Sequence, residues 1–378
     1  MRFLLVFRIS LALTVVIGAF MPLTWKAARN FYAVAAFWVT ASLVHVAWFL
    51  IPRLASFAPA ARWISIMWLG AMLAAIVLTI PFALLSGFSQ RLNLTLCSAC
   101  LPGVYAACCA LSGIVLAGTS TASFVVRQED IRIPGLAPGL DGFRIANLGD
   151  VHIGRFIDAN ELRRGIEAIN DLHVDLLVVT GDLVDDVDQL EETMRALEMS
   201  NAPRNIIAIL GNHEEMADLA RILAIYREHQ ARITLLVNEN TAIARGGATL
   251  YIAGVNFPMN PRGRHVLSRA AQRAAMSAQA NLAFADIAQG ETIVALSHNP
   301  EFFPFAVSHG AQLTLASHTH GGQLRLFGRP FIDVYRYLQG VYREGGAYLD
   351  VSAGFGHWLP IRFGVPREIV IDSLHGEG

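Results

Sequence analysis

The stretch FRIANLGDVH, Phe143–His152, is an apolar, strand-like run that ends in Gly-Asp-x-His. A helix-like segment, DANELRRGIEAIND at 158–171, follows it directly. The same rhythm returns twice, as VDLLVVTGD at 174–182 before a helix-like 187–199, and as NIIAILGNHE at 205–214 before a helix-like 215–229. Apolar runs that alternate with amphipathic helices indicate βαβ units and a largely parallel sheet. This part of the chain therefore predicts an α/β domain.

Later segments predict more strands. TAIARGGATLYIAGVN at 241–256 is typical of a hairpin, and the runs at 292–300 and 313–322 resemble buried strands. AYLDVSAGFG at 347–356 and REIVIDSL at 367–374 are interpreted as strands that close a second sheet.

The N-terminal third of the chain has a different composition. Of all 378 residues, 54% are hydrophobic and only 16% are charged, and residues 1–126 contain no Asp or Glu. Average soluble domains carry about a quarter charged residues. Four apolar runs reach the roughly 20 residues that a helix needs to cross a bilayer. They are Leu4–Leu23, Phe31–Ile51, Trp63–Leu85 and Leu96–Ala117, and they predict an all-α transmembrane bundle of about four helices.

The composition changes after Val126, which predicts three regions. These are a transmembrane region at 1–126, a linker and first strand at 127–142, and a second domain at 143–378. No small-x-small cleavage site follows the first apolar run, which argues against a signal peptide. The distribution of Lys and Arg between the loops favours a multi-pass inner-membrane protein with a cytoplasmic C-terminal domain. A net charge of -1 provides no argument for nucleic-acid binding.

Polar clusters follow the strand-like runs, at the sheet edge where open α/β folds bind ligands. They are Asp150 with His152, Asp182 with Asp185, Asn212 with His213, then His298, and finally His318 with His320. Alone, a Gly-Asp pair after a strand is equally typical of a turn with a helix cap. Together, these oxygen and nitrogen donors suit a divalent metal such as Mn, Fe, Co or Zn.

Seven of these side chains exceed what one tetrahedral ion uses. The seven are Asp150, His152, Asp182, Asn212, His298, His318 and His320. Two ions about 3.5 to 4 Å apart would use them all. Residues two apart on an extended chain face the same way, so His318 and His320 can each reach one of two neighbouring ions. Gly321 and Gly322 are interpreted as keeping this loop clear of the substrate.

The order D-x-H, G-D-x-x-D, G-N-H-E, H and H-x-H resembles the calcineurin-like metallophosphoesterase superfamily. The likeness runs from about Ile145 to Gln323, and the closing segment at 352–371 is similar to a bacterial subgroup with a hydrophobic N-terminus. The resemblance implies a four-layer α/β/β/α sandwich with a dinuclear centre at one edge. One departure is Ser317, where the family usually has glycine.

The resemblance also implies a role for each donor. It assigns Asp150, His152 and His320 to the first metal, Asn212, His298 and His318 to the second, and Asp182 to a bridge between them. His213 is implied to be the general acid or a stabiliser of transition-state charge. Asp185 is implied to orient a ligand or His213.

These assignments predict a mechanism. Two cations lower the pKa of a bridging water, the resulting hydroxide attacks phosphorus in line, and His213 protonates the leaving oxygen. Arg155 and His357 are candidates for substrate contacts, although Arg155 is equally well explained as a solvated loop residue.

The predicted protein is a membrane-anchored metallophosphoesterase, a phosphodiesterase or pyrophosphatase, acting on a lipid-linked substrate. Two alternatives stay open. One is an enzyme similar to the UDP-2,3-diacylglucosamine pyrophosphatases of lipid A synthesis. The other is a membrane sensor that binds a phospho-ligand without turning it over.

Overall fold

The computed structural model describes residues 63–64, 66–71, 74, 78, 81, 85, 88, 91–92, 95–154, 156–259, 268–331, 334–358 and 361–377. The chain divides into two compact units. The N-terminal unit comprises residues 1–122 together with 359–363, and the C-terminal unit comprises 123–358 together with 364–378. The segment 359–363 therefore belongs to the N-terminal unit, although the residues before and after it belong to the C-terminal unit.

The N-terminal unit contains helix α4, Thr95–Ser120. Its part from 103 to 120 is the one segment, among the described residues, that is long and apolar enough to cross a membrane. This matches the fourth predicted span, whereas the first two spans and about half of the third lie outside the described residues. At the end of α4, the amide of Arg362 donates to Ser120 Oγ at 2.7 Å, and Thr119 Oγ1 donates to the Arg362 carbonyl at 2.7 Å.

The C-terminal unit contains two six-stranded sheets. The first has the order β1, β14, β2, β3, β4, β5. Its strands are β1 (Val125–Ile133), β14 (Glu368–Gly376), β2 (Phe143–Asn147), β3 (Leu176–Thr180), β4 (Ile206–Ile209) and β5 (Ile233–Leu235). The run from β2 to β5 is parallel, with Ile145 opposite Leu176 and Val178 opposite Ile207.

The second sheet has the order β12, β13, β9, β8, β7, β6. Its strands are β12 (Gly340–Glu344), β13 (Ala347–Val351), β9 (Leu313–Ala316), β8 (Thr292–Ser297), β7 (Ala248–Val255) and β6 (Glu239–Arg245). The four central strands are parallel, and the edge strands β6 and β12 are antiparallel to their neighbours. The predicted hairpin at 241–256 is confirmed as β6 and β7.

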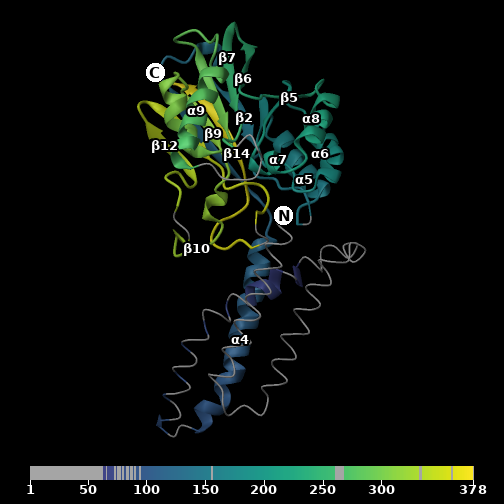
Figure 1. Cartoon of the computed structure of the whole chain (residues 1–378), viewed down its shortest axis with the longest axis vertical. Helices are drawn as coiled ribbons and strands as arrows, with labels where there is room; N and C mark the ends of the chain where they lie inside the picture. The colour runs from purple at the N-terminus through teal and green to yellow at the C-terminus, as the bar shows by residue number, and fades with distance from the viewer. Residues whose placement is uncertain are drawn as a thin grey trace. The chain divides into compact units, whose positions relative to one another are not determined.

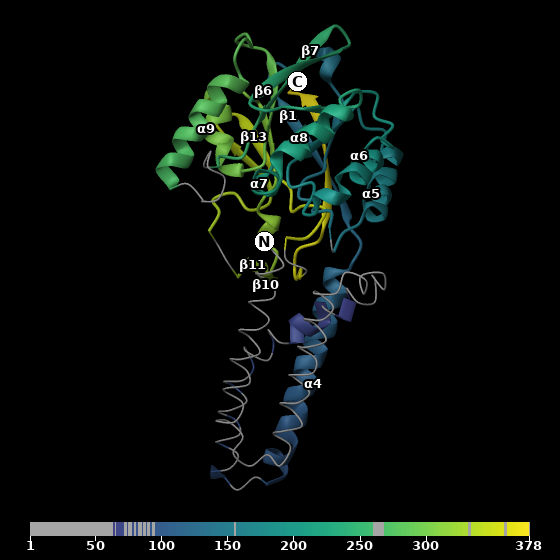
Figure 2. The ribbon, with the colours of Figure 1, turned by 45° about the vertical axis from the view of Figure 1, so that its right-hand side comes forward.

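The two sheets pack face to face, with helices on their outer faces. Helices α5 (Ala159–Asp171), α6 (Leu190–Leu197) and α8 (Leu219–Glu228) cover the first sheet, and α9 (Arg269–Ala283) covers the second. Figures 1 and 2 show these helices on opposite sides of the strands. The mixed α/β class predicted from the sequence is confirmed.

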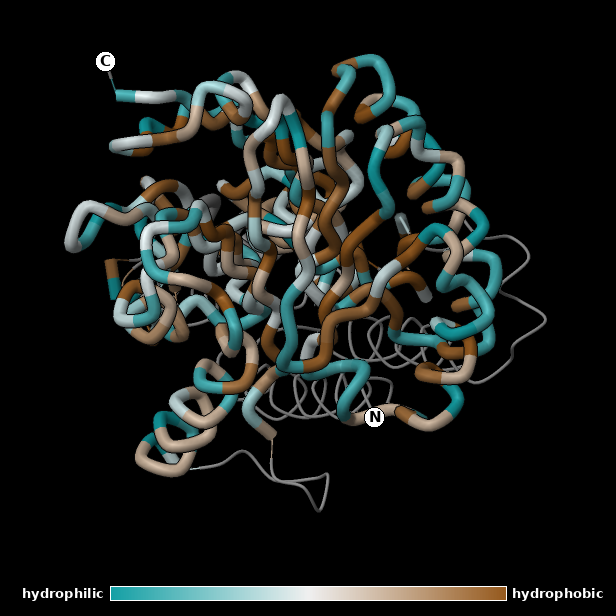
Figure 3. The backbone as a smooth tube through the Cα atoms, turned by 90° about the horizontal axis from the view of Figure 1, so that it is seen from above, coloured by the Kyte–Doolittle hydropathy of each residue, from teal (hydrophilic) through white to brown (hydrophobic). Residues whose placement is uncertain are grey.

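Adjacent residues of a central strand enter different cores. On β3, Leu176 and Val178 lie in the core between the sheets, whereas Leu177 and Val179 lie against the helices. Because both faces are covered, the strand is apolar throughout instead of alternating. The hydrophobic strands accordingly occupy the middle of the unit in Figure 3, and hydrophilic segments surround them.

Two details of the predicted elements are wrong. The strand at 367–374 was expected in the second sheet, but β14 lies in the first, parallel to β1 and antiparallel to β2. Its consecutive apolar residues, Ile369 to Ile371, suit either sheet, so the local pattern does not specify its partner. The helix expected at 215–229 is instead two helices, α7 (Asn212–Met216) and α8, because Asp218 caps α8 by accepting from the Arg221 amide at 3.2 Å.

A buried charge cluster ties the two sheets together. Arg127 on β1 donates to both carboxylate oxygens of Asp350 on β13, one of them at 2.9 Å, and lies 3.5 Å from Glu368 on β14. Asp350 and Asp372 are fully buried. Within the described part of the chain, neither oxygen of Asp372 meets a donor N–H, and its neighbour is the Asp350 carboxyl. A hydrogen bond between the two acids therefore needs a proton on one of them.

This pair should make stability depend on pH. Burial, and then the charge of Asp350, raise the pKa of Asp372 well above its ordinary value. A group with a raised folded-state pKa stabilises the protein below its unfolded pKa, and that stabilisation is lost as pH rises through the folded pKa. Asp372→Asn should remove this loss, since the amide donates to Asp350 at every pH. We expect the stability of the variant over wild type to increase as pH rises from 5 to 8.

Thermal unfolding at pH 5, 6.5 and 8 measures the difference. Asp171→Asn, an exposed position at the end of α5, is the matched control and should leave the pH dependence unchanged. A constant gap between Asp372→Asn and wild type across this range would contradict the shared proton.

Candidate dinuclear metal centre

Five strand ends deliver polar side chains to one place in the C-terminal unit. Asp150 and His152 follow β2, Asp182 follows β3, and Asn212 and His213 follow β4 of the first sheet. From the second sheet, His298 follows β8, while His318 and His320 follow β9. The His318 amide donates to Asp150 Oδ2 at 2.8 Å, so the ends of the two sheets are joined at this point.

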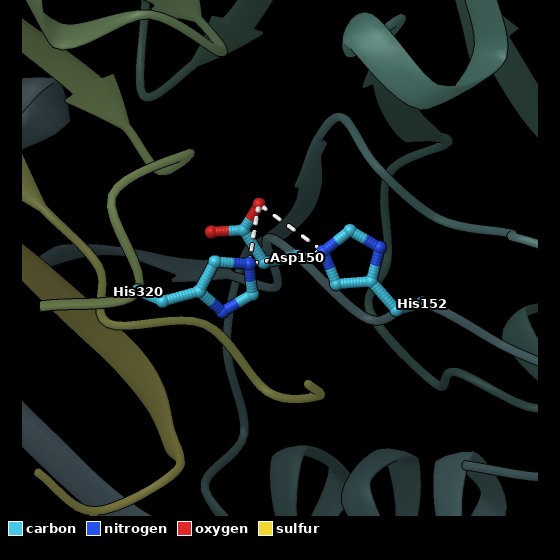
Figure 4. Close-up of side chains that lie close together, drawn as sticks. All are labelled: Asp150, His152 and His320. Carbon is cyan, nitrogen blue, oxygen red and sulfur yellow. Dashed lines mark hydrogen bonds and ion pairs between the residues drawn. The ribbon is translucent and has the colours of Figure 1, made fainter. Parts of the chain in front are cut away.

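Asp150, His152 and His320 form the first donor set. Asp150 Oδ1 lies 3.8 Å from the Nε2 atoms of both histidines, and these two nitrogens are 3.0 Å apart. Figure 4 shows both imidazoles directing a nitrogen toward the same carboxylate oxygen. All three side chains are buried.

Asp182, His298 and His318 form the second donor set, and Asn212 lies beside it. His298 Nε2 is 3.3 Å from Asp182 Oδ2, 3.2 Å from His318 Nδ1 and 3.1 Å from Asn212 Oδ1. Asp182 Oδ2 is also 3.7 Å from His152 Nε2 in the first set. Asp182 therefore lies between the two sets.

These separations are those expected of ligands around shared ions. Nitrogen and oxygen ligands bind at roughly 2.0–2.2 Å, so neighbours at tetrahedral or octahedral angles lie about 3.0–3.5 Å apart. The measured separations of 3.0 to 3.8 Å match or slightly exceed this spacing. The buried imidazole nitrogens face one another and also face the two carboxylates of Asp150 and Asp182. This arrangement of donors suits cations. The residues present thus fit two divalent metals.

Several donors have unusual backbone conformations. Asp150, His152, Asp182, His318 and His320 all have positive φ, between 50° and 74°. Residues other than glycine rarely adopt this region, and it occurs at sites where the surrounding structure holds a functional side chain in place. The backbone is therefore bent to aim the donors.

Thr180 sets the tautomer of His298. Its carbonyl oxygen lies 2.8 Å from His298 Nδ1, so that Nδ1 donates and Nε2 keeps its lone pair toward the donor set. Ser317 Oγ donates to the same carbonyl at 2.8 Å and is fully buried. The serine at the position usually occupied by glycine in the family therefore completes this arrangement without displacing a donor.

The charges of the site act strongly on two of its imidazoles. Burial alone would lower the pKa of His298, but the Asp182 carboxylate, followed by Asp150, raises it to about 9. Burial, and then the charge of His298, lower the pKa of His318 to about 3. The two carboxylates thus attract positive charge to the centre, and a divalent cation would displace the proton of His298.

His213 and Asp185 lie together at the side of the donor sets. The His213 side chain is partly exposed, with Nε2 3.8 Å from Asp182 Oδ2 and Nδ1 3.3 Å from Asp185 Oδ1. The same Asp185 oxygen is 3.1 Å from His152 Nδ1. Asp185 therefore contacts His213 and one of the donors, His152, whereas the resemblance implied contact with an unspecified ligand or with His213.

Glu214 is a structural residue of the site that sequence reasoning missed. Its buried carboxylate accepts from four backbone amides, at distances of 2.7 to 3.2 Å. They belong to Asp182, Leu183, Val184 and Gly211. The glutamate that ends the GNHE motif could have pointed to this role. From the sequence alone, however, it is equally well explained as an exposed residue of the following helix. In the structure, it holds the loop that presents Asp182.

Glu214→Ala should destabilise the protein. Four buried amides lose their acceptor, and each unsatisfied group costs about 1–3 kcal/mol unless water enters. We expect a loss on the order of 3 kcal/mol in unfolding free energy and weaker metal binding. Chemical denaturation measures the loss, and Glu215→Ala, at the next residue and half-buried, is the control. Equal effects of the two substitutions would contradict the loop-holding role.

Two aromatic residues beside His318 were also missed. The rings of Phe257 and Tyr335 lie 5.0 and 5.7 Å from the His318 ring, centroid to centroid. Neither stands in a motif, so no sequence signal identified them.

The two glycines after His320 serve packing. A side chain at Gly321 would lie 2.8 Å from Val365 Cγ1, and one at Gly322 would lie 3.0 Å from Pro330 Cβ. Both also have positive φ. The structure thus gives a turn and close packing as the reason for these glycines, instead of the clearance for substrate expected from the sequence.

The two candidate substrate contacts differ in outcome. Arg155 lies outside the described residues. His357 is buried, at 4% exposure, in the segment that packs against Asp150: the neighbouring Gly356 amide donates to the Asp150 carbonyl at 2.7 Å. The role of His357 toward the substrate stays a prediction.

Comparison with known families identifies the domain. Residues 143–322 match the family described as calcineurin-like phosphoesterase. The C-terminal unit therefore contains a calcineurin-like metallophosphoesterase domain, as the motifs predicted. The protein is a metal-dependent phosphoester hydrolase.

Several named proteins are similar to this chain. The uncharacterized metallophosphoesterase YkuE of Bacillus subtilis is 28% identical over 260 residues, which cover 65% of this chain and 84% of that protein. The uncharacterized metallophosphoesterase Cj0846 of Campylobacter jejuni is 30% identical over 260 residues, covering 67% of this chain and 63% of that protein. UDP-2,3-diacylglucosamine pyrophosphatase LpxG of Chlamydia muridarum is 23% identical over 290 residues, which cover 64% of this chain and 86% of that protein.

Proposed function

We propose that this chain is a membrane-anchored, dimetal phosphohydrolase that cleaves a phosphoester or pyrophosphate bond of a lipid-linked substrate. The position of Asp182 Oδ2 carries the dimetal part, since it lies 3.7 Å from a donor of the first set and 3.3 Å from one of the second. The apolar helix at 103–120 and the likeness to a pyrophosphatase named for a lipid-linked substrate support the membrane part.

In this proposal the seven donors hold two divalent cations, Mn, Fe or Zn. Asp150, His152 and His320 bind the first, Asn212, His298 and His318 bind the second, and Asp182 binds both. When bound, such cations lower the pKa of water and neutralise charge on phosphoryl oxygens.

The residues beside the donors then perform the proton transfer. Asp185 accepts from His213 Nδ1–H, which leaves Nε2 directed toward the donor sets. Protonated there, His213 donates to the leaving oxygen as the bond to phosphorus breaks. The same aspartate accepts from His152 Nδ1–H, so that His152 Nε2 keeps its lone pair toward the first cation.

Two alternatives have specific support. The relative LpxG favours a UDP-2,3-diacylglucosamine pyrophosphatase as the particular activity. A non-catalytic sensor is the alternative of a different class. It is disfavoured because all seven donors and His213 are brought together. The proposal also puts the domain in the cytoplasm at the inner membrane, which the excess of basic residues on one side of the predicted spans supports.

Turnover by the full-length chain in detergent micelles tests the proposal. Substrates are p-nitrophenyl phosphate, bis-p-nitrophenyl phosphate and UDP-2,3-diacylglucosamine, each with Mn²⁺, Fe²⁺ or Zn²⁺ and after chelation. Metal-dependent cleavage of the lipid-linked pyrophosphate well above both aryl esters supports the proposal. Cleavage of the aryl esters alone overturns its lipid part. Two metals bound without any turnover would favour the sensor.

A further inference from the structure

A hairpin with an exposed apolar tip follows the second metal loop. It consists of β10 (Arg325–Leu326) and β11 (Arg329–Pro330), joined by Phe327 and Gly328. Phe327 is 95% exposed, and the apolar side chains beside it are exposed as well: Leu326 by 46%, Phe331 by 65% and Val334 by 64%. Figures 1 and 2 show this hairpin at the end of the C-terminal unit opposite the β6–β7 hairpin.

The turn itself is unfavourable for its residue. Phe327 and Gly328 have φ of 50° and 77°, so both central residues have the positive φ of a type I′ turn. Such a position favours Asn, Asp or Gly, and a bulky aromatic residue there is an outlier. The almost complete exposure of Phe327 means that packing does not offset this cost. Neither local propensity nor the protein core therefore accounts for a phenylalanine at this tip.

The hairpin is fixed at its base to the metal loop. Arg325 Nε donates to the Gly321 carbonyl at 2.7 Å, and the Phe331 amide donates to the Leu324 carbonyl at 3.0 Å. Pro330 packs where a side chain on Gly322 would stand. Since Gly321 follows His320 directly, whatever holds the tip also sets the position of this donor.

The charges around the tip are mainly positive. The segment 325–336 contains Arg325, Arg329 and Arg336 against one acid, Asp333. Arg336 is paired with Glu344 at 2.8 Å, so Arg325 and Arg329 provide the positive charge beside the turn. Arg329 is exposed next to the turn. An apolar tip with flanking arginines matches an anionic bilayer surface, where aromatic and aliphatic side chains enter the interface and cations remain at the headgroups. A stable protein interface uses roughly 20–30 residues on each side, which exceeds this small tip.

We propose that the hairpin at 325–330 inserts its tip into the interface of an anionic bilayer. This deepens the proposed function and rests on its membrane part: α4 ends at Ser120, and the first strand of the C-terminal unit begins five positions later at Val125. Insertion of Phe327 places the loop that carries His318 and His320 at the lipid surface. A phosphate group carried by a lipid then reaches the metal centre without leaving the bilayer.

Photocrosslinking in the full-length chain tests this. p-Benzoylphenylalanine replaces Phe327 in one sample and Leu282 in another, because Leu282 on α9 is also exposed and apolar, at 61%. Both proteins are reconstituted in nanodiscs of phosphatidylcholine with one third phosphatidylglycerol and irradiated. Lipid adducts are detected by mass spectrometry, and we expect their yield at position 327 to be at least fivefold higher than at position 282. Arg329→Gln should reduce the adducts at 327 several-fold, whereas Arg164→Gln, an exposed arginine on α5, should not.

The outcomes separate this inference from the proposed function. Equal adduct yields at 327 and 282 would overturn insertion, and so would crosslinks from 327 to a second copy of the chain. The adduct yield is measured independently of catalysis. A protein that forms adducts at 327 but cleaves no phosphoester would therefore support insertion and contradict the proposed enzymatic function. Bis-p-nitrophenyl phosphate hydrolysis in detergent should be the same for the Phe327 and Leu282 samples.

Discussion

Asp182→Asn should lower kcat by about 10³-fold or more, because several kcal/mol of transition-state stabilisation depend on a correctly held metal pair. Asp182 Oδ2 is the oxygen between the two donor sets, 3.3 Å from His298 Nε2 and 3.7 Å from His152 Nε2. Asparagine removes its charge and presents either an oxygen or an amide N–H there. Asp182 Oδ1 accepts from the His213 amide at 2.8 Å, and the asparagine oxygen can keep that bond. The fold should therefore survive.

The measurements are turnover and metal content per chain. The variant should bind fewer than two metals, while wild type binds two. Asp188→Asn is the matched control: it follows the same strand, but its carboxylate is 78% exposed and pairs with Arg221 on the surface. A variant at position 182 that keeps both metals and full turnover would refute the bridging assignment.

His213→Gln should reduce kcat by roughly 10²–10⁴-fold on substrates with a poor leaving group, the range typical of general acid catalysis. His213 Nε2 lies 3.8 Å from Asp182 Oδ2, and His213 forms a third donor group with His152 and Asp182. It belongs to neither of the two donor sets, which have their own ligands without it. Metal content should therefore stay near that of wild type. The loss should be far smaller for a p-nitrophenyl ester, whose leaving group departs without a proton.

Comparing kcat on an alkyl and a p-nitrophenyl phosphodiester measures this dependence. His173→Gln, an exposed histidine after α5, serves as the control. An equal loss on both esters would assign His213 to charge stabilisation instead, and loss of a metal would assign it to ligation.

Much of the fold was predictable because its signals are local. The runs ending at Asp150, Asp182 and Asn212 are largely apolar, and each is followed by an amphipathic helix, which indicates buried strands. The family of the domain was also predictable, since its motifs stand in a fixed order along the chain.

Other features required the tertiary structure. Whether β14 pairs with β1 and β2 or joins the second sheet depends on contacts between residues more than 200 positions apart, such as Ser373 with Arg144. Glu214 looks like an ordinary helix residue until the loop at Asp182 is placed over it. The burial of His357 and the exposure of Phe327 are likewise set by what packs against them.

The sequence by itself thus determined the kinds of donor at each strand end and the α/β class, because residue type and periodicity are properties of neighbouring positions. Only the tertiary structure decided that these donors lie 3.0 to 3.8 Å from one another, with Asp182 near donors of both sets. Separations between distant segments follow from how the sheets pack, and packing is a property of the whole chain.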